Sequence, residues 1–146
     1  MLQIKLVEPG ALLPIRATTY SAGLDLFASE EAIIQPNNRK LISTGLSICL
    51  PDCSYGRIAP RSGLSLKALD VGGGVIDADY RGIVKIILIN NSNEKYVVNY
   101  GDKIAQLIIE KIYMIDPIIV TELNETARND KGFGSSGIWV KAIFFI

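Results

Sequence analysis

Histidine is absent from this chain of 146 residues, and cysteine occurs only twice. Without imidazole there is no serine–histidine or cysteine–histidine nucleophile pair, and no zinc site that depends on histidine. Cys49 and Cys53 are too few for a thiolate zinc site, and a Pro-Asp turn signal lies between them in place of CxxC spacing. A general base would therefore have to be a carboxylate, and we expect reduced thiols, as in a cytosolic-type compartment.

The chain also lacks an excess of charge of either sign. Fifteen basic residues balance fifteen acidic ones, and no run of like charge occurs. This composition predicts no nucleic-acid partner and no membrane partner. The segment LQIKLV at 2–7 is strand-like and does not form a charged and then apolar leader, so we expect a cytoplasmic and/or nuclear protein.

Long segments of helical period are the third absence. Short apolar runs broken by turn residues predict an all-β sandwich or barrel in one domain. The runs lie at 2–7, 24–28, 32–36, 40–51, 55–60, 83–90, 96–102 and 103–113. The best helix candidate is short, with Ser62 as N-cap and Gly72 as its end. We expect a barrel at 1–120, a polar, glycine-rich mobile arm at 121–137 and an apolar tail at 138–146.

Five clusters of polar residues and glycine follow one another along the chain. They are AGLDLFA (22–28), PRSGLS (60–65), GGGVIDADYRG (72–82), GDKIAQLI (101–108) and RNDKGFGSSG (128–137). Together they resemble the five ordered motifs of the trimeric dUTP pyrophosphatases (dUTPases), over nearly the whole chain. The resemblance implies a jelly-roll-like β-barrel, or β-clip, fold with one short helix. It also implies hydrolysis of dUTP to dUMP and diphosphate.

Asp77 is the candidate catalytic base. In the resemblance its carboxylate orients and deprotonates a water that attacks the α-phosphorus, and such a water must lie within about 2.6–3.2 Å. Taken alone, an aspartate near glycine more often caps a turn, and it is the complete motif set that favours catalysis. Asp79 is expected to be a turn residue of the same hairpin, without a direct part in the chemistry. Arg81 is expected to be a salt-bridge partner at the base of the hairpin.

Selection of the base and the sugar is expected from the same hairpin. Its glycines leave backbone groups uncovered, and the resemblance implies that those around Gly74 and Ile76, and near Lys85 on the returning strand, bond uracil. Cytosine would meet mismatched donors, and thymine would be refused by crowding at its methyl group. Tyr80 is expected to pack on the deoxyribose and exclude a 2′-hydroxyl. Without the motif, an ordinary core aromatic is the alternative.

Two other clusters are expected to contact the phosphates. Arg61, Ser62 and Gly63 lie at the start of the expected helix, where free N–H groups suit an anion. A serine at this place is by default only a cap. Gln106 matches the family glutamine that reaches the phosphates, and would otherwise be a polar residue of an edge strand.

The glycine-rich arm is expected to close the site. The resemblance implies that Arg128, Gly134, Ser135 and Ser136 contact the phosphates. It also implies that Phe133 stacks on uracil. The arm departs from the family pattern at Asn129 and Lys131, positions often held by glycine. The following apolar tail is too short to cross a bilayer. We expect it to dock on the assembly as a strand or plug, with a disordered extension as the alternative.

Asp25 is expected to face the waters of a Mg²⁺ ion clasped by the three phosphates. Magnesium usually keeps waters and relies on substrate oxygens, so no dense cluster of protein ligands is needed. A strand-end aspartate in a turn is the alternative. The resemblance further implies a homotrimer with shared active sites, in which the arm closes over the site of a neighbour.

Two other functions are compatible with this type of sequence. The dCTP deaminases share the fold but rely on a glutamate-centred site, and DADYRG with the glycine-rich arm favours a dUTPase. A non-catalytic, dUTPase-like partner-binding protein would be expected to lack Asp77, Tyr80, Arg128 or Phe133. All four are present.

Overall fold

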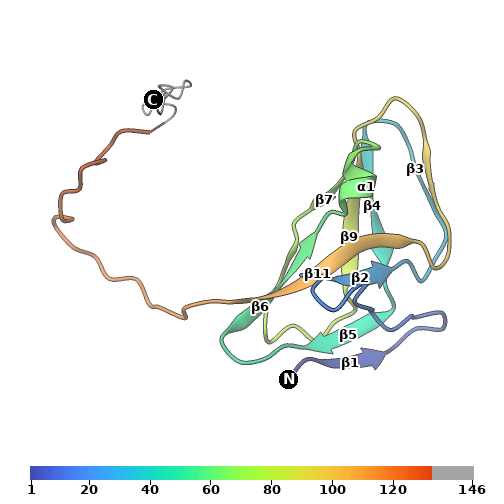
Figure 1. Ribbon diagram of the computed structural model, residues 1–146, viewed down its shortest axis with the longest axis horizontal. Coiled ribbons are helices and arrows are strands. Elements are labelled where there is room, and N and C mark those ends of the chain that lie inside the picture. Colours follow the sequence, from blue (N-terminus) through green and yellow to red (C-terminus); the bar gives the residue numbers. More distant parts are fainter. Residues whose placement is uncertain (133–146) are drawn as a thin grey trace, which may run out of the picture. The chain divides into compact units, whose positions relative to one another are not determined.

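The computed structural model describes residues 1–132, and these residues confirm the expected all-β architecture with one short helix (Figure 1). The helix is α1 (Ser62–Ser65). The strands are β1 (Gln3–Leu6), β2 (Leu24–Phe27), β3 (Ala32–Ile34), β4 (Asn38–Ser43), β5 (Leu46–Cys49), β6 (Ser54–Ala59), β7 (Leu69–Gly72), β8 (Val75–Ile76), β9 (Lys85–Asn90), β10 (Tyr96–Val98) and β11 (Lys103–Lys111).

The strands form antiparallel sheets around a shared apolar core. The larger sheets have the orders β2-β11-β6-β8 and β4-β9-β7, and the pairs β1-β5 and β10-β3 complete the set in residues 1–132. Figure 1 shows β11 running between β6 and β2. Alternate residues point inward, as with Ile86 and Leu88 of β9 and Leu46 and Ile48 of β5, and all four are nearly fully buried. The core therefore follows from the period-two apolar pattern.

Each apolar run noted in the sequence contains a strand, but the run at 40–51 contains two. The chain breaks it at Thr44 and Gly45, between β4 and β5. Gly45 has φ of 68°, a conformation that glycine adopts without strain. Thr44 is fully buried, and its hydroxyl donates to the carbonyl of Val84 at 2.7 Å. A buried, satisfied hydroxyl thus fixes the corner between the two strands.

The helix is shorter than the sequence predicted. It starts at Ser62 as expected, but its N-cap is Arg61, and it ends at Ser65 instead of continuing to Gly72. Only Leu64 is buried on it, and Leu66 is 90% exposed, so no apolar face holds a longer helix against the core. Ala68, with φ of 59°, turns the chain into β7, which pairs with β9.

Gly73 and Gly74 form the corner at which the chain leaves one sheet and joins another. Both have positive φ, of 71° and 87°. The preceding strand β7 pairs with β9, and the following strand β8 pairs with β6. A Cβ on Gly74 would lie 2.8 Å from the carbonyl oxygen of Ile58. The glycines are therefore required by the change of sheet.

The compact unit spans Met1–Met114, and the residues after it belong to a second unit. Residues 115–132 contain neither helix nor strand. A turn at Thr126–Asn129 is closed by two reciprocal hydrogen bonds between side chain and backbone, of 2.9 and 3.0 Å. Asn129 has φ of 43°, which explains why glycine suits this position, and asparagine tolerates it well. Within residues 1–132, no helix has the length and apolar character that a membrane crossing requires.

Candidate functional site

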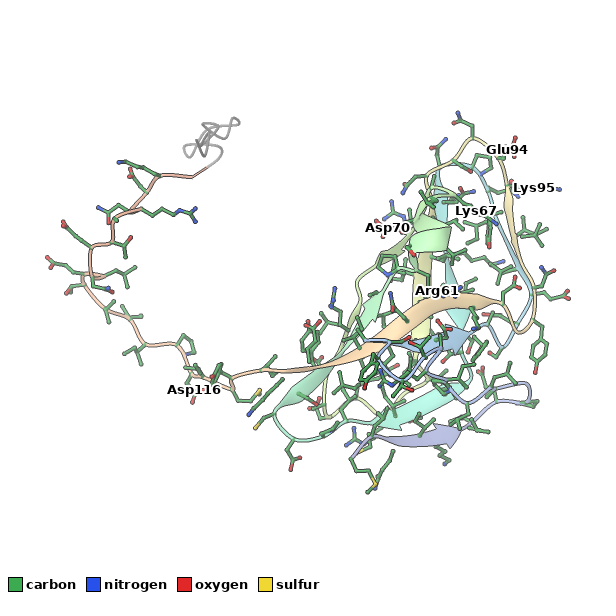
Figure 2. All side chains as sticks on the ribbon, in the orientation of Figure 1. Arg61, Lys67, Asp70, Glu94, Lys95 and Asp116 are labelled. Atoms are coloured by element: carbon green, nitrogen blue, oxygen red, sulfur yellow. The ribbon has the colours of Figure 1, made fainter. Side chains whose placement is uncertain are left out.

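Five of the predicted site residues gather at one pocket. It has a volume of about 240 Å³, and we call it the Arg61 pocket. Its predicted members are Asp25, Arg61, Ser62, Gly63 and Gln106, and residues of the loop at 17–23 complete its lining. The β2–β11 register explains the grouping, because Gln106 lies directly opposite Asp25, and also opposite Ala59 at the end of β6. Arg61 follows β6 and lies close to β11 (Figure 2).

The charged groups of the Arg61 pocket hold one another in place. Asp25 is buried, and its Oδ1 accepts a hydrogen bond from Arg61 Nε at 3.1 Å. The Nζ of Lys103 lies 2.8 Å from Oδ2 of the same carboxylate. That oxygen has no aligned hydrogen bond within residues 1–132, so its contact with Lys103 is an ion pair without hydrogen-bond geometry. The carboxylate is thus flanked by one cation on each oxygen.

Gln106 is fixed by the backbone and by a glycine whose role the sequence did not reveal. Its Nε2 donates to the carbonyl of Pro60 at 2.9 Å. A Cβ on Gly23 would lie 2.9 Å from the Cβ of Gln106, so only glycine leaves room for this side chain. An amide nitrogen carries two donors, and one therefore remains for a ligand in the pocket. A steric requirement for glycine at this position leaves no signal in a single sequence.

Asp77 lies in a different part of the molecule, in residues 73–84, which we call the Asp77 loop. A tight turn follows β8, with the Tyr80 N–H donating to the Asp77 carbonyl at 3.1 Å. Asp77 and Asp79 line a second pocket of about 460 Å³, the Asp77 pocket, together with Tyr55 and Met114. No hydrogen bond or ion pair within residues 1–132 involves the Asp77 carboxylate. It is therefore available to a ligand or to a water.

Strand β6 shows how far apart these two regions are. Ile76, the residue before Asp77, pairs with Gly56 of β6. Arg61 lies five residues beyond Gly56, which at about 3.3 Å per residue corresponds to roughly 16 Å of extended chain. The structure therefore groups the five residues of the Arg61 pocket but does not bring Asp77 to them within one chain.

Tyr80 is placed by its neighbours in the Asp77 loop. Its hydroxyl donates to the carbonyl of Ile83 at 3.0 Å, and 43% of the residue is exposed, so it is not a core aromatic. A side chain on Gly82 would collide with the hydroxyl of Tyr80. Gly82, which ends the cluster GGGVIDADYRG, is a second glycine whose role the sequence did not reveal.

The expectation for Arg81 is wrong. Its guanidinium forms no ion pair within residues 1–132 and instead donates to the carbonyls of Ala78 and Tyr80, at 2.7 and 2.9 Å. Among residues 1–132, no carboxylate lies within ion-pair distance of this side chain, whereas the tight turn presents two carbonyls to it. Arg81 therefore stabilises the turn that carries Asp77.

Of the residues expected to bond uracil, Gly74 and Ile76 lie in the first part of the Asp77 loop, and Lys85 directly follows its last residue. Gly74 is at the corner between sheets, and its carbonyl already accepts from the Ile58 N–H at 2.8 Å. Ile76 is half-buried in β8, and Lys85 is exposed at the start of β9. The hairpin that these residues share has β7 and β9 as its arms, with Gly72 paired to Ile87.

The arm residues are only partly described. Arg128 is exposed in the second unit, and its carbonyl accepts from the Lys131 N–H at 2.9 Å. The other four arm residues expected at the site, Phe133, Gly134, Ser135 and Ser136, lie outside the described residues, as does the apolar tail at 138–146. Their expected roles stay predictions.

Beside the Asp77 pocket, Tyr55, Arg57 and Glu110 form a cluster that the sequence did not reveal. The hydroxyl of Tyr55 donates to Glu110 Oε2, and Arg57 Nε pairs with Oε1, both at 2.5 Å. The Tyr55 hydroxyl and, after it, Arg57 hold the pKa of Glu110 below its usual value. The hydrogen bond to Glu110 raises the pKa of Tyr55, and burial adds to it. These partners meet only because Tyr55 and Glu110 are opposite each other in the β6–β11 register.

Comparison with known proteins identifies the family. The dUTPase family model matches residues 10–137, which is most of the chain. The chain belongs to the dUTPase family. The deoxyuridine 5'-triphosphate nucleotidohydrolase of Variola virus is 52% identical over 125 residues, covering 86% of this chain and 85% of the relative. The enzyme of the same name from Arabidopsis thaliana is 49% identical over 137 residues, covering 93% and 82%.

Solved structures of dUTPases have the same fold. A mutant dUTPase of Staphylococcus bacteriophage 80alpha with dUpNHpp superposes with a TM-score of 0.89 at 29% identity, covering 94% of this chain and 99% of that chain. A mutant dUTPase of S. aureus phage phi11, described with a structural Mg(II) ion, has a TM-score of 0.80 at 28% identity, covering 86% and 99%. The jelly-roll-like β fold implied by the five motifs is therefore confirmed.

Proposed function

We propose that the protein hydrolyses dUTP to dUMP and diphosphate. The observation that carries this proposal is the Arg61 pocket, in which residues from three of the five motifs meet and the Arg61 guanidinium and the Gln106 amide line one cavity. A bound chain of phosphates requires such donors to neutralise its charge and to hold it in position. The dUTPase relatives named above support deoxyuridine as the nucleoside.

In this proposal, Arg61, Ser62, Gly63 and Gln106 bind the phosphates. Asp25 and the Lys103 carbonyl each accept from one donor of the Arg61 guanidinium, and the remaining donors suit phosphate oxygens. A Cβ added at Gly63 would meet no atom within 4 Å, so the space beside this backbone is open and a phosphate can approach it closely. Gln106 contributes the amide donor that Pro60 leaves unused.

Asp77 is proposed as the general base. Its carboxylate would take a proton from a water as that water attacks the α-phosphorus, and the proton would remain on the carboxylate while diphosphate leaves. The absence of any other partner for this carboxylate within residues 1–132 supports the role. The turn that carries Asp77 is stabilised by Arg81, which fixes its backbone.

The separation of the two regions supports an active site shared between copies of the chain. Asp77 lines none of the Arg61 pocket, and the extended chain from Gly56, opposite Ile76, to Arg61 is about 16 Å long, so a water within about 3 Å of Asp77 belongs to a different region of the same chain. A second copy that places its Asp77 loop beside this pocket removes the gap. We therefore propose a homotrimer with shared sites. Exposed apolar pairs such as Leu41 and Ile87 offer surface for such contacts.

Mg²⁺ is proposed as the cofactor, and Asp25 fits it. The carboxylate lines the Arg61 pocket, and its two oxygens have more acceptor sites than the contacts with Arg61 and Lys103 use, so it has capacity for a metal-bound water. One carboxylate is sufficient because magnesium commonly keeps several waters and binds substrate phosphates. When bound, the ion would neutralise charge that develops on the phosphate oxygens.

Selection of the nucleoside is proposed for the Asp77 loop and the strands beside it. Backbone groups near Gly74, Ile76 and Lys85 would bond the polar edge of uracil, and the ring of Tyr80 would pack on the deoxyribose. Gly82 leaves space for the Tyr80 hydroxyl to reach Ile83, which holds the ring in one place. Arg128 and the glycine-rich residues after it would cover the bound nucleotide.

The decisive test is diphosphate release from dUTP, dCTP, dTTP and UTP in the presence of Mg²⁺. We expect release from dUTP alone at a substantial rate. Formation of ammonia from dCTP would indicate a deaminase, and no turnover with retained nucleotide binding would indicate a non-catalytic binding protein.

The shared site is tested by mixing two inactive variants, Asp77→Asn and Arg61→Ala. After joint refolding, mixed assemblies contain sites in which one chain supplies an intact Asp77 and another an intact Arg61 pocket. We expect dUTP hydrolysis to return in the mixture but in neither variant alone. No recovery, with mixed assemblies verified by mass, would show that both residues act from one chain.

A further inference from the structure

Lys103 lies in the cluster GDKIAQLI but is not among the residues expected to contact the substrate. Its Nζ is 2.8 Å from Asp25 Oδ2, and its backbone carbonyl accepts a hydrogen bond from Arg61 Nη1 at 3.2 Å. One residue therefore contacts both charged groups of the Arg61 pocket, through two different atoms.

A β-bulge turns Lys103 toward this pocket. Gln106 and Ala105 pair with Asp25 and Leu26 in regular register, but Lys103 pairs with Phe27, and the register shifts between Lys103 and Ala105. In unbroken register Lys103 would lie one residue further along, on the face opposite to Asp25. The bulge places it opposite Phe27, on the same face as Asp25, and its ammonium lies 6.0 Å from the Phe27 ring centroid.

The bulge also accounts for the burial in β11. Ile104 and Ala105 are adjacent and both are almost fully buried, although alternate residues of a regular strand point to opposite faces. Two consecutive core residues are what an inserted residue produces. The face of the strand on which Lys103 lies is therefore set by the backbone.

The contacts of Lys103 control how the pocket meets an anion. Each oxygen of the Asp25 carboxylate has one cation, Arg61 on Oδ1 and Lys103 on Oδ2. Without Lys103, the buried carboxylate would keep only Arg61, and its charge would repel incoming phosphates more strongly. The guanidinium is also held at two points, Nε by Asp25 and Nη1 by the Lys103 carbonyl, and it lines the pocket with donors that these two contacts do not use.

We propose that Lys103 is a positioning residue for triphosphate binding. Its ammonium neutralises Asp25, and through Asp25 it orients Arg61 toward the phosphates without touching them. This inference rests on the proposed function, since the ligand of the Arg61 pocket is taken to be the phosphate chain of dUTP.

The first test compares Lys103→Met with Lys103→Arg, and uses Lys111→Met at the exposed end of the same strand as the control. Lys103→Met should raise KM for dUTP and weaken metal-free binding of dUpNHpp by about tenfold, with kcat changed by less than about threefold, because the lost contact serves bound substrate and transition state alike. Lys103→Arg should restore most of the affinity. Lys111→Met should resemble the wild type.

The second test is a double-mutant cycle with Asp25→Asn, read out as dUpNHpp affinity and as thermal unfolding. If Lys103 acts through Asp25, Lys103→Met should cost less than about twofold in affinity once the carboxylate is gone. The same tenfold loss in both backgrounds, or no loss in the wild-type background, would overturn the proposal. Failure of the wild type to hydrolyse dUTP or bind dUpNHpp would overturn the proposed function itself. In that case, a coupling between Lys103→Met and Asp25→Asn that is seen only in thermal unfolding would show that Lys103 has a structural role alone.

Discussion

The Arg61 pocket and the Asp77 loop are held in place in different ways. In the pocket, side chains fix side chains: Asp25 is buried between Arg61 and Lys103, and Gln106 is bonded to a backbone carbonyl. In the loop, the backbone is fixed by its own neighbours, and the Asp77 carboxylate has no partner within residues 1–132. The pocket is thus organised before a ligand arrives, whereas the loop presents one unpaired reactive group.

The difference suggests how the work is divided between the two regions. The Arg61 pocket is proposed to bind several negatively charged phosphates, and it benefits from cations that are already fixed in position. A region that must supply a base to a neighbouring site needs a rigid backbone and a carboxylate without competing contacts. The comparison therefore predicts that substitution of Asp77 in the loop lowers kcat, and that substitutions in the Arg61 pocket weaken nucleotide binding.

The largest effect is expected for Asp77→Asn. The amide keeps the shape of the side chain but cannot accept a proton, so kcat for dUTP should fall by about 10²–10⁴, the usual contribution of a general base. KM and dUpNHpp affinity should change little. Steady-state kinetics and calorimetric binding measure both quantities.

Asp79→Asn is the matched control, because Asp79 lies on the same turn and lines the same pocket. We expect its kcat to stay within about threefold of the wild type, as for a residue outside the chemistry. Equal kcat for Asp77→Asn and the wild type would remove Asp77 from the role of base.

The next effect concerns stability and contrasts one glycine from each region. Gly74→Ala places a Cβ 2.8 Å from the Ile58 carbonyl at a φ of 87°, so it should destabilise the fold by about 1–3 kcal/mol. Gly63→Ala meets nothing within 4 Å and lies in α1, where alanine is favoured by up to about 1 kcal/mol. Thermal unfolding should therefore separate the two variants in opposite directions. A similar unfolding temperature for both would contradict the strain assigned to the corner.

A smaller effect is expected from Tyr80→Phe. The change removes the hydrogen bond to the Ile83 carbonyl, worth about 0.5–1.5 kcal/mol, but keeps the ring that is proposed to exclude a 2′-hydroxyl. The preference for dUTP over UTP should therefore persist in Tyr80→Phe and be reduced in Tyr80→Ala. Competition assays with the two nucleotides measure this ratio. Equal preference in both variants would mean that the ring does not select the sugar.

Much of the fold could be predicted from the sequence, because the apolar runs have the period of a half-buried strand. The positions of β2, β9 and β11 follow directly from that pattern. The segment Leu69–Gly72 could not be predicted, because its leucine and valine fit a helix as well as a strand, and only pairing with β9 decides between them. Ala68 turns the chain at a positive φ, for which alanine gives no signal.

The site was predictable as a set of motifs, but its geometry was not. The sequence identified Asp25, Arg61 and Gln106, and their meeting depends on the pairing of β11 with both β2 and β6. The role of Lys103 was not predictable because its orientation results from a bulge, which local sequence does not announce. Arg81 was misassigned because a long cation beside acidic residues suggests an ion pair, whereas the turn offers nearer carbonyls.

The smallest effect is expected from removing the Tyr55 hydroxyl. Tyr55 lies in β6, lines the Asp77 pocket and donates a hydrogen bond to Glu110. The Tyr55 hydroxyl lowers the pKa of Glu110 from 4.5, so this contact stabilises the fold above about pH 4.5 and is lost as the pH falls through the lower folded value. The pKa of Tyr55 is raised from 10.0, so the stabilisation persists below pH 10 and is lost as the pH rises further. Tyr55→Phe should therefore lower the unfolding temperature slightly between these limits and converge with the wild type outside them. Tyr113→Phe, at an exposed tyrosine, is the control, and a pH-independent difference for Tyr55→Phe would attribute the effect to packing instead of to Glu110.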